Sequence, residues 1–143
     1  MRLYIAGPLF TAAEREWNVR IARSLESAGY EVWLPQEHEP REKIATEIFV
    51  MDVQGIDWTD ILIGIMDGPD PDSGTCWECG YAYATKKTVL LVRTDFRTGS
   101  DNTFAPYNLM LSESCDARIE VPFSSTDEVV ARILVELPKL KLK

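Results

Sequence analysis

The chain has 143 residues, 45% of them hydrophobic, and this length accommodates one domain with a sizeable buried core. Its 15 basic residues are outnumbered by 23 acidic residues, so the formal net charge at pH 7 is −8. Nucleic-acid backbones and anionic membranes would repel such a protein, and we expect neither as a partner, whereas a small neutral substrate carries no such penalty.

The chain shows no pattern typical of export or membrane insertion. Gly7 and Pro8 interrupt the apolar run of the first ten residues, MRLYIAGPLF, which therefore do not resemble a signal peptide. No apolar run reaches the about 18 residues that a membrane span needs. Three cysteines, an odd number without a secretory context, favour a reducing compartment over a disulfide framework. We therefore expect a cytoplasmic protein.

The first half of the chain alternates strand and helix patterns. The apolar run at Arg2–Ala6, ended by Gly7, is typical of a buried strand. Thr11 and Glu14 have the spacing of a capping box, and the helix that they begin is expected to end at Gly29. The next expected elements are a strand at residues 30–34, an exposed loop at residues 36–41 and a helix at residues 44–58.

The second half continues this alternation. Residues 61–66 form a nearly continuous apolar run, as in a parallel sheet that helices cover on both faces. A loop at residues 67–72 then precedes a helix from about Ser73 to Thr85. The remaining expected elements are a strand at Thr88–Arg93, a polar loop at residues 94–106, an ambiguous segment at residues 108–111, a strand at residues 117–121 and an amphipathic helix at residues 125–137.

This order predicts one α/β domain over residues 1–143, with right-handed crossovers. We expect a flavodoxin-like (Rossmann-like) fold, in which a five-stranded parallel sheet has helices on both faces. Ligands of such sheets bind beyond the carboxyl ends of the strands, which here lead into residues 7–10, 67–75 and 94–97. The site is therefore expected among these loops, with Gly7 and Phe10 among its substrate contacts.

The segment DSGTCWECGYA at residues 72–82 contains a CxxC pair, Cys76 and Cys79. Such a pair at a helix start can lower a thiol pKa, as in thiol–disulfide oxidoreductases, but there it usually follows the first strand and here it follows the third. Structural zinc needs four ligands, and the other candidates, Cys115 and His38, are distant and unpaired in the sequence. We expect no metal and no cofactor.

The carboxylates of the same region offer a different chemistry. Glu78 lies near the expected helix start, where the helix dipole favours the ionised, nucleophilic form, although Thr75 and Glu78 also have capping-box spacing. Asp60 directly precedes an apolar strand, Asp72 lies in the loop before the helix, and both are compatible with ordinary turns. Tyr4 is compatible with a core aromatic residue. Two carboxylates in different environments can serve as nucleophile and proton donor at a sugar carbon.

Four segments together resemble the nucleoside 2-deoxyribosyltransferases. They are YIAGPLF at residues 4–10, DWTDILIGIMDG at residues 57–68, DSGTCWECGYA at residues 72–82 and YNLM at residues 107–110. Their order and spacing match the family over about residues 3–120. The resemblance implies transfer of a 2-deoxyribosyl group between nucleobases of 2′-deoxynucleosides, by a retaining double displacement through a covalent glutamyl intermediate.

The resemblance also implies roles for individual residues. Glu78 matches the nucleophile of the family, and Tyr4 matches the tyrosine that orients it. Asp60 matches the aspartate that contacts the base and handles its proton. Asp72 and Asn108 match the pair that binds the 5′-hydroxyl of the sugar.

The YNLM segment implies an assembly. In the family it reaches the site of the neighbouring subunit, so Asn108 and Met110 are expected to act across an interface of a homo-oligomer, either a dimer or a trimer of dimers. Some members use their C-terminal carboxylate in the site, and the basic tail LPKLKLK gives no reason to expect that role here. Residues 36–39 and 95–97 are further candidates for base contacts.

Other functions remain open at the level of the sequence. A related hydrolase group cleaves 2′-deoxynucleoside 5′-monophosphates and has serine where this chain has Asp72, whose carboxylate would repel a phosphate. A thiol oxidoreductase would use the CxxC pair, and a nucleotide-sensing module would bind through the carboxylates without turnover. The choice between purine-only and mixed bases, the tolerance of ribonucleosides and the extent of side hydrolysis are not determined by these patterns.

Overall fold

The structure is a computed structural model that describes residues 1–40, 42, 44–98, 103 and 105–143. Its elements are, in chain order, β1 (Arg2–Ala6), α1 (Ala12–Ser27), β2 (Glu31–Trp33), α2 (Pro35–His38), α3 (Ala45–Trp58), β3 (Ile61–Ile65), α4 (Ser73–Ala84), β4 (Thr88–Arg93), α5 (Leu109–Ser114), β5 (Ala117–Glu120), α6 (Thr126–Glu136) and the 3-10 turn η1 (Leu137–Lys139). The strands form one parallel sheet in the order β2-β1-β3-β4-β5. The expected flavodoxin-like class is confirmed.

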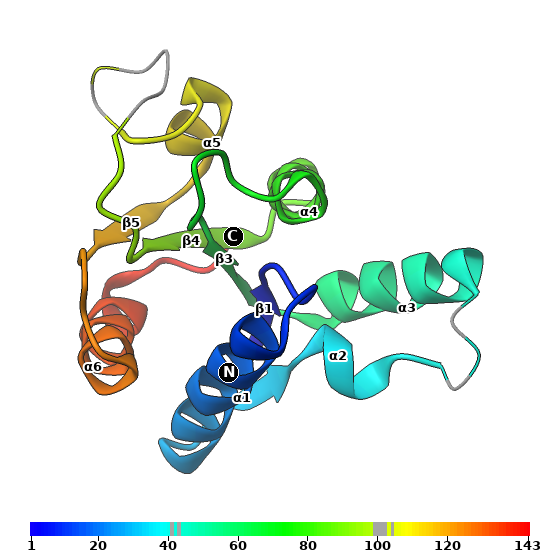
Figure 1. Cartoon of the computed structure of the whole chain (residues 1–143). Coiled ribbons are helices and arrows are strands. Elements are labelled where there is room, and N and C mark those ends of the chain that lie inside the picture. Colours follow the sequence, from blue (N-terminus) through cyan, green and yellow to red (C-terminus); the bar gives the residue numbers. More distant parts are fainter. Residues whose placement is uncertain (41, 43, 99–102, 104) are drawn as a thin grey trace.

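Helices cover both faces of this sheet, with α1 and α6 on one side and α3 and α4 on the other (Figure 1). The alternation of side chains along β1 divides its residues between two cores. Leu3 and Ile5 pack in the core beneath α1 and α6, whereas Tyr4 and Ala6 pack in the core beneath α3 and α4. The hydroxyl group of Tyr4 therefore lies on the α3–α4 face of the sheet.

The helix α4 starts at the carboxyl-terminal edge of the sheet and packs closely on β3. Asp72 is its N-cap, because a side-chain oxygen of Asp72 accepts a 2.9 Å hydrogen bond from the backbone N–H of Thr75. Gly64 of β3 permits the close approach, since a Cβ atom there would lie 2.7 Å from Sγ of Cys79. This packing determines how far Glu78, which precedes Cys79, extends over the neighbouring strand β1.

Several expectations about local structure are confirmed. Thr11 and Glu14 form the capping box of α1, and Gly29 ends that helix region with a φ of +94°. Ser125 and Glu128 form a second capping box at α6. Among the described residues, no helix combines the length and the apolar character that crossing a membrane requires.

Other local expectations are corrected. Residues 35–38 form the helical turn α2 in place of a loop, because Pro35 suits the first position of a helix and His38 stacks on Trp33 with ring centroids 3.9 Å apart. The ambiguous segment becomes α5, with Asn108 as its N-cap. Thr75 and Glu78 do not form a capping box, since α4 starts at Ser73. Within the expected loops, residues 41, 99–102 and 104 lie outside the described residues.

Candidate active site

Tyr4 and Glu78 meet on the face of the sheet that α3 and α4 cover. Tyr4 is fully buried in β1, and its Oη donates a 2.6 Å hydrogen bond to Oε1 of Glu78. In α4, Thr75, Cys79 and Ala82 turn toward the sheet and leave Glu78 on the flank of the helix beside β1. The structure thus brings together the expected nucleophile and its expected orienting partner, which lie 74 positions apart in the sequence.

Burial dominates the protonation of Glu78. The loss of hydration raises the pKa of Glu78 to about 7, while the hydrogen bond from Tyr4 acts in the opposite direction. The carboxylates of Asp52 and Asp72 raise this pKa further. Since Glu78 is the sixth residue of α4, it lies beyond the first turn, where the helix dipole acts. The expectation that the helix dipole keeps Glu78 ionised is therefore corrected: desolvation outweighs it.

The phenol of Tyr4 stays a hydrogen-bond donor throughout the neutral pH range. Burial raises the pKa of Tyr4 far above its ordinary value, and the nearby carboxylates of Glu78 and Asp52 add to this effect. A protonated Tyr4 holds one oxygen of Glu78 in place. Within the described part of the chain the other oxygen, Oε2, has no hydrogen-bond partner, so it can bond to a ligand.

Asp52 of α3 is a further acid of this site, and the sequence analysis missed it. Its Oδ1 is buried and has no hydrogen-bond partner among the described residues. Its charge raises the pKa of both Glu78 and Tyr4, so Asp52 lies within electrostatic range of both groups. Partial burial is the main cause that raises the pKa of Asp52 to about 6, and the nearby carboxylate of Glu39 adds to it. A detectable signal existed, because Asp52 lies four residues before the buried Ile56 on one helix face, where an unpaired carboxylate is unusual.

Asp60 lies outside this site. It precedes β3 and therefore sits at the amino-terminal edge of the parallel sheet, whereas α4 starts from the carboxyl-terminal edge. Its carboxylate accepts hydrogen bonds from the backbone N–H of Arg2 at 2.9 Å and from the guanidinium of Arg2 at 2.6 Å. The bond from this guanidinium holds the pKa of Asp60 below its usual value. The placement contradicts the base-contacting role that the sequence analysis assigned to Asp60.

Asp72, the N-cap of α4, offers a hydrogen-bond acceptor near Glu78. Its Oδ2 accepts from the backbone N–H of Thr75 at 2.9 Å and from Oγ1 of Thr75 at 3.1 Å. No partner is present for Oδ1 within the described part of the chain. Asp72 also raises the pKa of Glu78, which places its charge near that carboxylate. A hydroxyl group of a ligand can therefore bond to Oδ1.

Gly7 and Phe10 belong to the loop after β1. Gly7 packs tightly on β3, since a Cβ atom there would lie 3.0 Å from the side chain of Ile65. Phe10 is 76% exposed. The structure therefore gives Gly7 a packing role at the edge of the site and leaves the ring of Phe10 open to a ligand or a partner.

Asn108 and Met110 lie on the other flank of α4. They line a cavity of about 510 Å³ together with Cys76 and Tyr83. Cys76 and Glu78 are separated by roughly 200° around the helix, at about 100° per residue. Within one subunit, Asn108 and Met110 are thus held apart from the Tyr4–Glu78 contact.

Cys76 and Cys79 are free thiols in settings that suit packing. Burial raises the pKa of both thiols, so the reactive thiolate is disfavoured. Sγ of Cys79 lies against Gly64, and Sγ of Cys76 contacts the carbonyl oxygen of Pro71 at 3.7 Å. These environments argue against a thiol–disulfide exchange activity.

The chain resembles known proteins in both sequence and structure. The family model for nucleoside 2-deoxyribosyltransferases matches residues 3–110. An uncharacterised protein of Ureaplasma parvum serovar 3 is 28% identical over 161 residues, covering 97% of this chain and 98% of that protein. The structure of the 2-deoxyribosyltransferase of Bacillus psychrosaccharolyticus is 28% identical, with a TM-score of 0.71 over 91% of this chain and 90% of that chain.

A more distant structure shares the fold. The CMP N-glycosidase of Clostridium botulinum is 18% identical, with a TM-score of 0.67 over 94% of this chain and 99% of that chain. The family model covers most of the length of the present chain, including β1, α3 and α4, which carry Tyr4, Asp52 and Glu78. The chain therefore belongs to the nucleoside 2-deoxyribosyltransferase family.

Proposed function

We propose that this protein transfers the 2-deoxyribosyl group between nucleobases of 2′-deoxynucleosides. The observation that carries the proposal is the 2.6 Å hydrogen bond from Tyr4 to the partly buried Glu78, near a second partly buried acid, Asp52. Two acids in different environments can divide the tasks of nucleophile and proton donor at a glycosidic carbon. Family membership supports the same reaction class.

In the proposed first step, the ionised Glu78 attacks the anomeric carbon through Oε2 while Tyr4 holds Oε1. The bond between this carbon and the base nitrogen breaks, its electron pair leaves with the base, and a deoxyribosyl ester of Glu78 forms. A pKa near 7 leaves a substantial ionised fraction at neutral pH. The oxocarbenium-like transition state is stabilised by the adjacent negative charge.

Asp52 is the proposed proton carrier for the base, in place of Asp60. Its pKa of about 6 allows it to donate a proton to the leaving base and to accept one from the incoming base. The incoming base then attacks the same carbon and releases Glu78. Two inversions at one carbon give overall retention.

Gln36 is a proposed base contact in α2, which packs against the helix α3 that carries Asp52. Its Nε2 donates a 3.0 Å hydrogen bond to the carbonyl oxygen of Arg15, and its buried Oε1 has no partner among the described residues. Arg15 also pairs with Glu39, whose charge reaches Asp52. The unpaired oxygen can accept a hydrogen bond from an amino group of adenine or cytosine.

The proposed substrate is the free nucleoside and not its monophosphate. Oδ1 of Asp72 can accept a hydrogen bond from a 5′-hydroxyl, typically about 1.5–3 kcal/mol net for a charged partner. A 5′-phosphate would face the same carboxylate, and each unit-charge repulsion at about 4 Å and an effective dielectric of 20 is on the order of 4 kcal/mol. Because Asp72 attracts a 5′-hydroxyl and repels a 5′-phosphate, hydrolysis of nucleoside monophosphates is disfavoured as the function.

The test is incubation of the protein with deoxyinosine and free adenine or cytosine, followed by chromatography and intact-protein mass measurement. We expect deoxyadenosine or deoxycytidine as products and a deoxyribosyl adduct on the protein. The Glu78→Gln variant should give neither product nor adduct. A parallel arm with deoxyadenosine 5′-monophosphate should show little turnover. Release of a base from the monophosphate at a higher kcat/KM would establish the hydrolase instead.

A further inference from the structure

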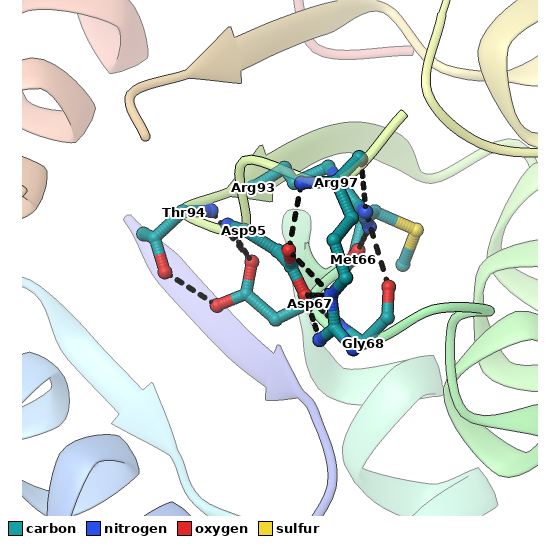
Figure 2. A network of polar contacts seen from close by, with 7 residues as sticks. All are labelled: Met66, Asp67, Gly68, Arg93, Thr94, Asp95 and Arg97. Carbon is teal, nitrogen blue, oxygen red and sulfur yellow. Dashed lines mark hydrogen bonds and ion pairs between the residues drawn. The ribbon is translucent and has the colours of Figure 1, made fainter. Parts of the chain in front are cut away.

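Two loops at the carboxyl-terminal edge of the sheet are joined by reciprocal hydrogen bonds, drawn in Figure 2. From the β3–α4 loop, the carboxylate of Asp67 accepts from the backbone N–H and the Oγ1 of Thr94 at 2.5 and 2.6 Å, and from the N–H of Asp95 at 2.9 Å. From the β4–α5 loop, Oδ2 of Asp95 accepts from the N–H of Gly68 at 3.0 Å. We call Asp67, Gly68, Arg93, Thr94 and Asp95 the interloop clasp.

Arg93 is the buried centre of this clasp. It is 2% exposed, and its guanidinium donates to the carbonyl oxygens of Met66, Gly68 and Arg97. Hydrogen bonds from a charged donor are stronger than neutral ones. Both carbonyl groups that precede and follow Asp67 are therefore held by one side chain from the neighbouring strand (Figure 2).

A short and stiff connector links the clasp to Asp72. Its sequence is Gly68-Pro69-Asp70-Pro71, and each proline restricts its own φ to about −65°. Gly68 has a φ of +108°, a conformation that favours glycine. With few free torsions between the two points, the position of the clasp restricts where the start of α4, and with it Asp72, can lie.

We propose that the interloop clasp positions Asp72 for the 5′-hydroxyl of the substrate. Arg93 and Asp67 are positioning residues in this proposal, because they act through the connector and Asp72 and do not touch the sugar. The inference rests on the proposed function of Asp72. A misplacement of about 1 Å disrupts a hydrogen bond and lowers the rate substantially, so loosening the clasp should weaken recognition of the 5′-hydroxyl in particular.

The experiment compares kcat/KM for 2′-deoxyadenosine and for 2′,5′-dideoxyadenosine, which lacks the 5′-hydroxyl, with cytosine as the acceptor base. The wild type should prefer the hydroxylated substrate by about tenfold or more, as expected for a charge-assisted hydrogen bond. Asp67→Ala and Arg93→Lys should lower this preference to about twofold or less while retaining most of the activity on the dideoxy substrate. A general loss of folding would reduce both activities equally.

A double-mutant cycle and a matched control sharpen the test. Asp72→Ala should remove the preference by itself, and the Asp67→Ala/Asp72→Ala variant should lose no more of it. Asp116→Ala is the control, because Asp116 similarly accepts a 2.8 Å bond from the backbone N–H of Val89, but at the amino-terminal edge. Its preference should equal that of the wild type.

The outcomes separate the inference from the function on which it rests. Asp67→Ala decides the test by itself if Arg93→Lys does not fold. A wild type that transfers no deoxyribose from either substrate overturns the proposed function. A wild type that transfers and prefers the 5′-hydroxyl, with the same preference in Asp67→Ala, overturns the positioning role alone. The positioning role is also overturned if the wild type transfers the deoxyribosyl group but shows no preference for the substrate with the 5′-hydroxyl.

Discussion

The side chain of Glu78 is partly buried, and the loss of hydration raises the pKa of its carboxyl group to about 7 from an ordinary value of 4.5. Below about pH 4.5 the folded and the unfolded chain both hold this proton, so the shift has no effect on stability. Between about pH 4.5 and 7 the unfolded chain releases the proton first, so folding becomes less favourable as the pH rises. Above pH 7, the raised pKa of Glu78 lowers the free energy of unfolding by roughly 3 kcal/mol.

We therefore expect Glu78→Gln to be more stable than the wild type at pH 8, by up to about 3 kcal/mol, and similar to it at pH 4.5. The introduced amide would keep an oxygen acceptor for the hydroxyl group of Tyr4. Urea unfolding at both pH values measures the difference. The control is Glu128→Gln, because bonds from Ser125 lower the pKa of Glu128, so this variant should lose stability at pH 8. Equal stability of Glu78→Gln and wild type at pH 8 would contradict the buried-acid account.

Asp52 should determine the shape of the pH–rate profile. With pKa values of about 6 for Asp52 and about 7 for Glu78, the coupled pair should give a bell-shaped dependence of kcat/KM. Asp52→Asn cannot carry a proton, so we expect a loss of about 10²- to 10⁴-fold. Its profile should rise with pH without an alkaline limb. Asp60→Asn serves as the comparison, and it should keep the bell-shaped profile of the wild type.

At the scale of elements, the position of α4 depends on how closely it approaches β3. Gly64 makes this approach possible, because its missing Cβ leaves room for Sγ of Cys79. The next residue toward the helix start, Glu78, reaches Tyr4 on β1 from this position. The close packing of two elements therefore sets the geometry of a hydrogen bond between a helix and a neighbouring strand.

Gly64→Ala should displace α4, since the new Cβ would lie 2.7 Å from Sγ of Cys79 and 3.0 Å from the side chain of Leu91. We expect a loss of about 1–3 kcal/mol in the free energy of unfolding, together with reduced transfer activity. Gly64→Ala/Cys79→Ala should recover part of both, because it removes the nearest atom. Measurements on Cys79→Ala complete the cycle. Full loss of activity in Cys79→Ala alone would show that this thiol does more than pack.

At the scale of the whole molecule, the outer surface near α5 is apolar. Met110 is 72% exposed, Leu109 is 46% exposed and Tyr83 is 49% exposed, and Met110 and Tyr83 line one cavity with Asn108. Exposed apolar side chains that gather beside a cavity are typical of interaction surfaces. Since these residues lie on the flank of α4 away from Glu78, a second copy is the simplest way for Asn108 and Met110 to reach a sugar at Glu78.

Subunit mixing tests the expectation that two subunits share a site. Glu78→Gln lacks the nucleophile, and Asn108→Ser lacks the amide while serine still suits the N-cap of α5. Each variant alone should show little transfer. After mixing and exchange, a dimer with one subunit of each kind would have one intact site, so about a quarter of the wild-type activity should return. No recovery in a sample whose subunits have exchanged would place Asn108 and Glu78 of one subunit in the same site.

The sequence by itself determined the succession of elements and the fold class. Periodicity and caps are local properties, so the capping box at Thr11 and the apolar run of β3 indicated their elements correctly. The family motifs identified Glu78 and Tyr4 as candidates for one site. The contact between them, 74 positions apart, became visible once the strand order placed β1 beside β3 and beneath α4.

The tertiary structure decided which acids share the site and how they ionise. The residue before a parallel strand and the residue after it lie at opposite edges of the sheet. Asp60 precedes β3 and therefore lies at the amino-terminal edge, beside Arg2 and away from Glu78, which the sequence analysis did not take into account. Asp52 joined the site through the packing of α3 against the sheet. The pKa of Glu78 rises because burial removes water from its carboxylate, and burial is a property of the packed molecule that no helix position in the sequence specifies.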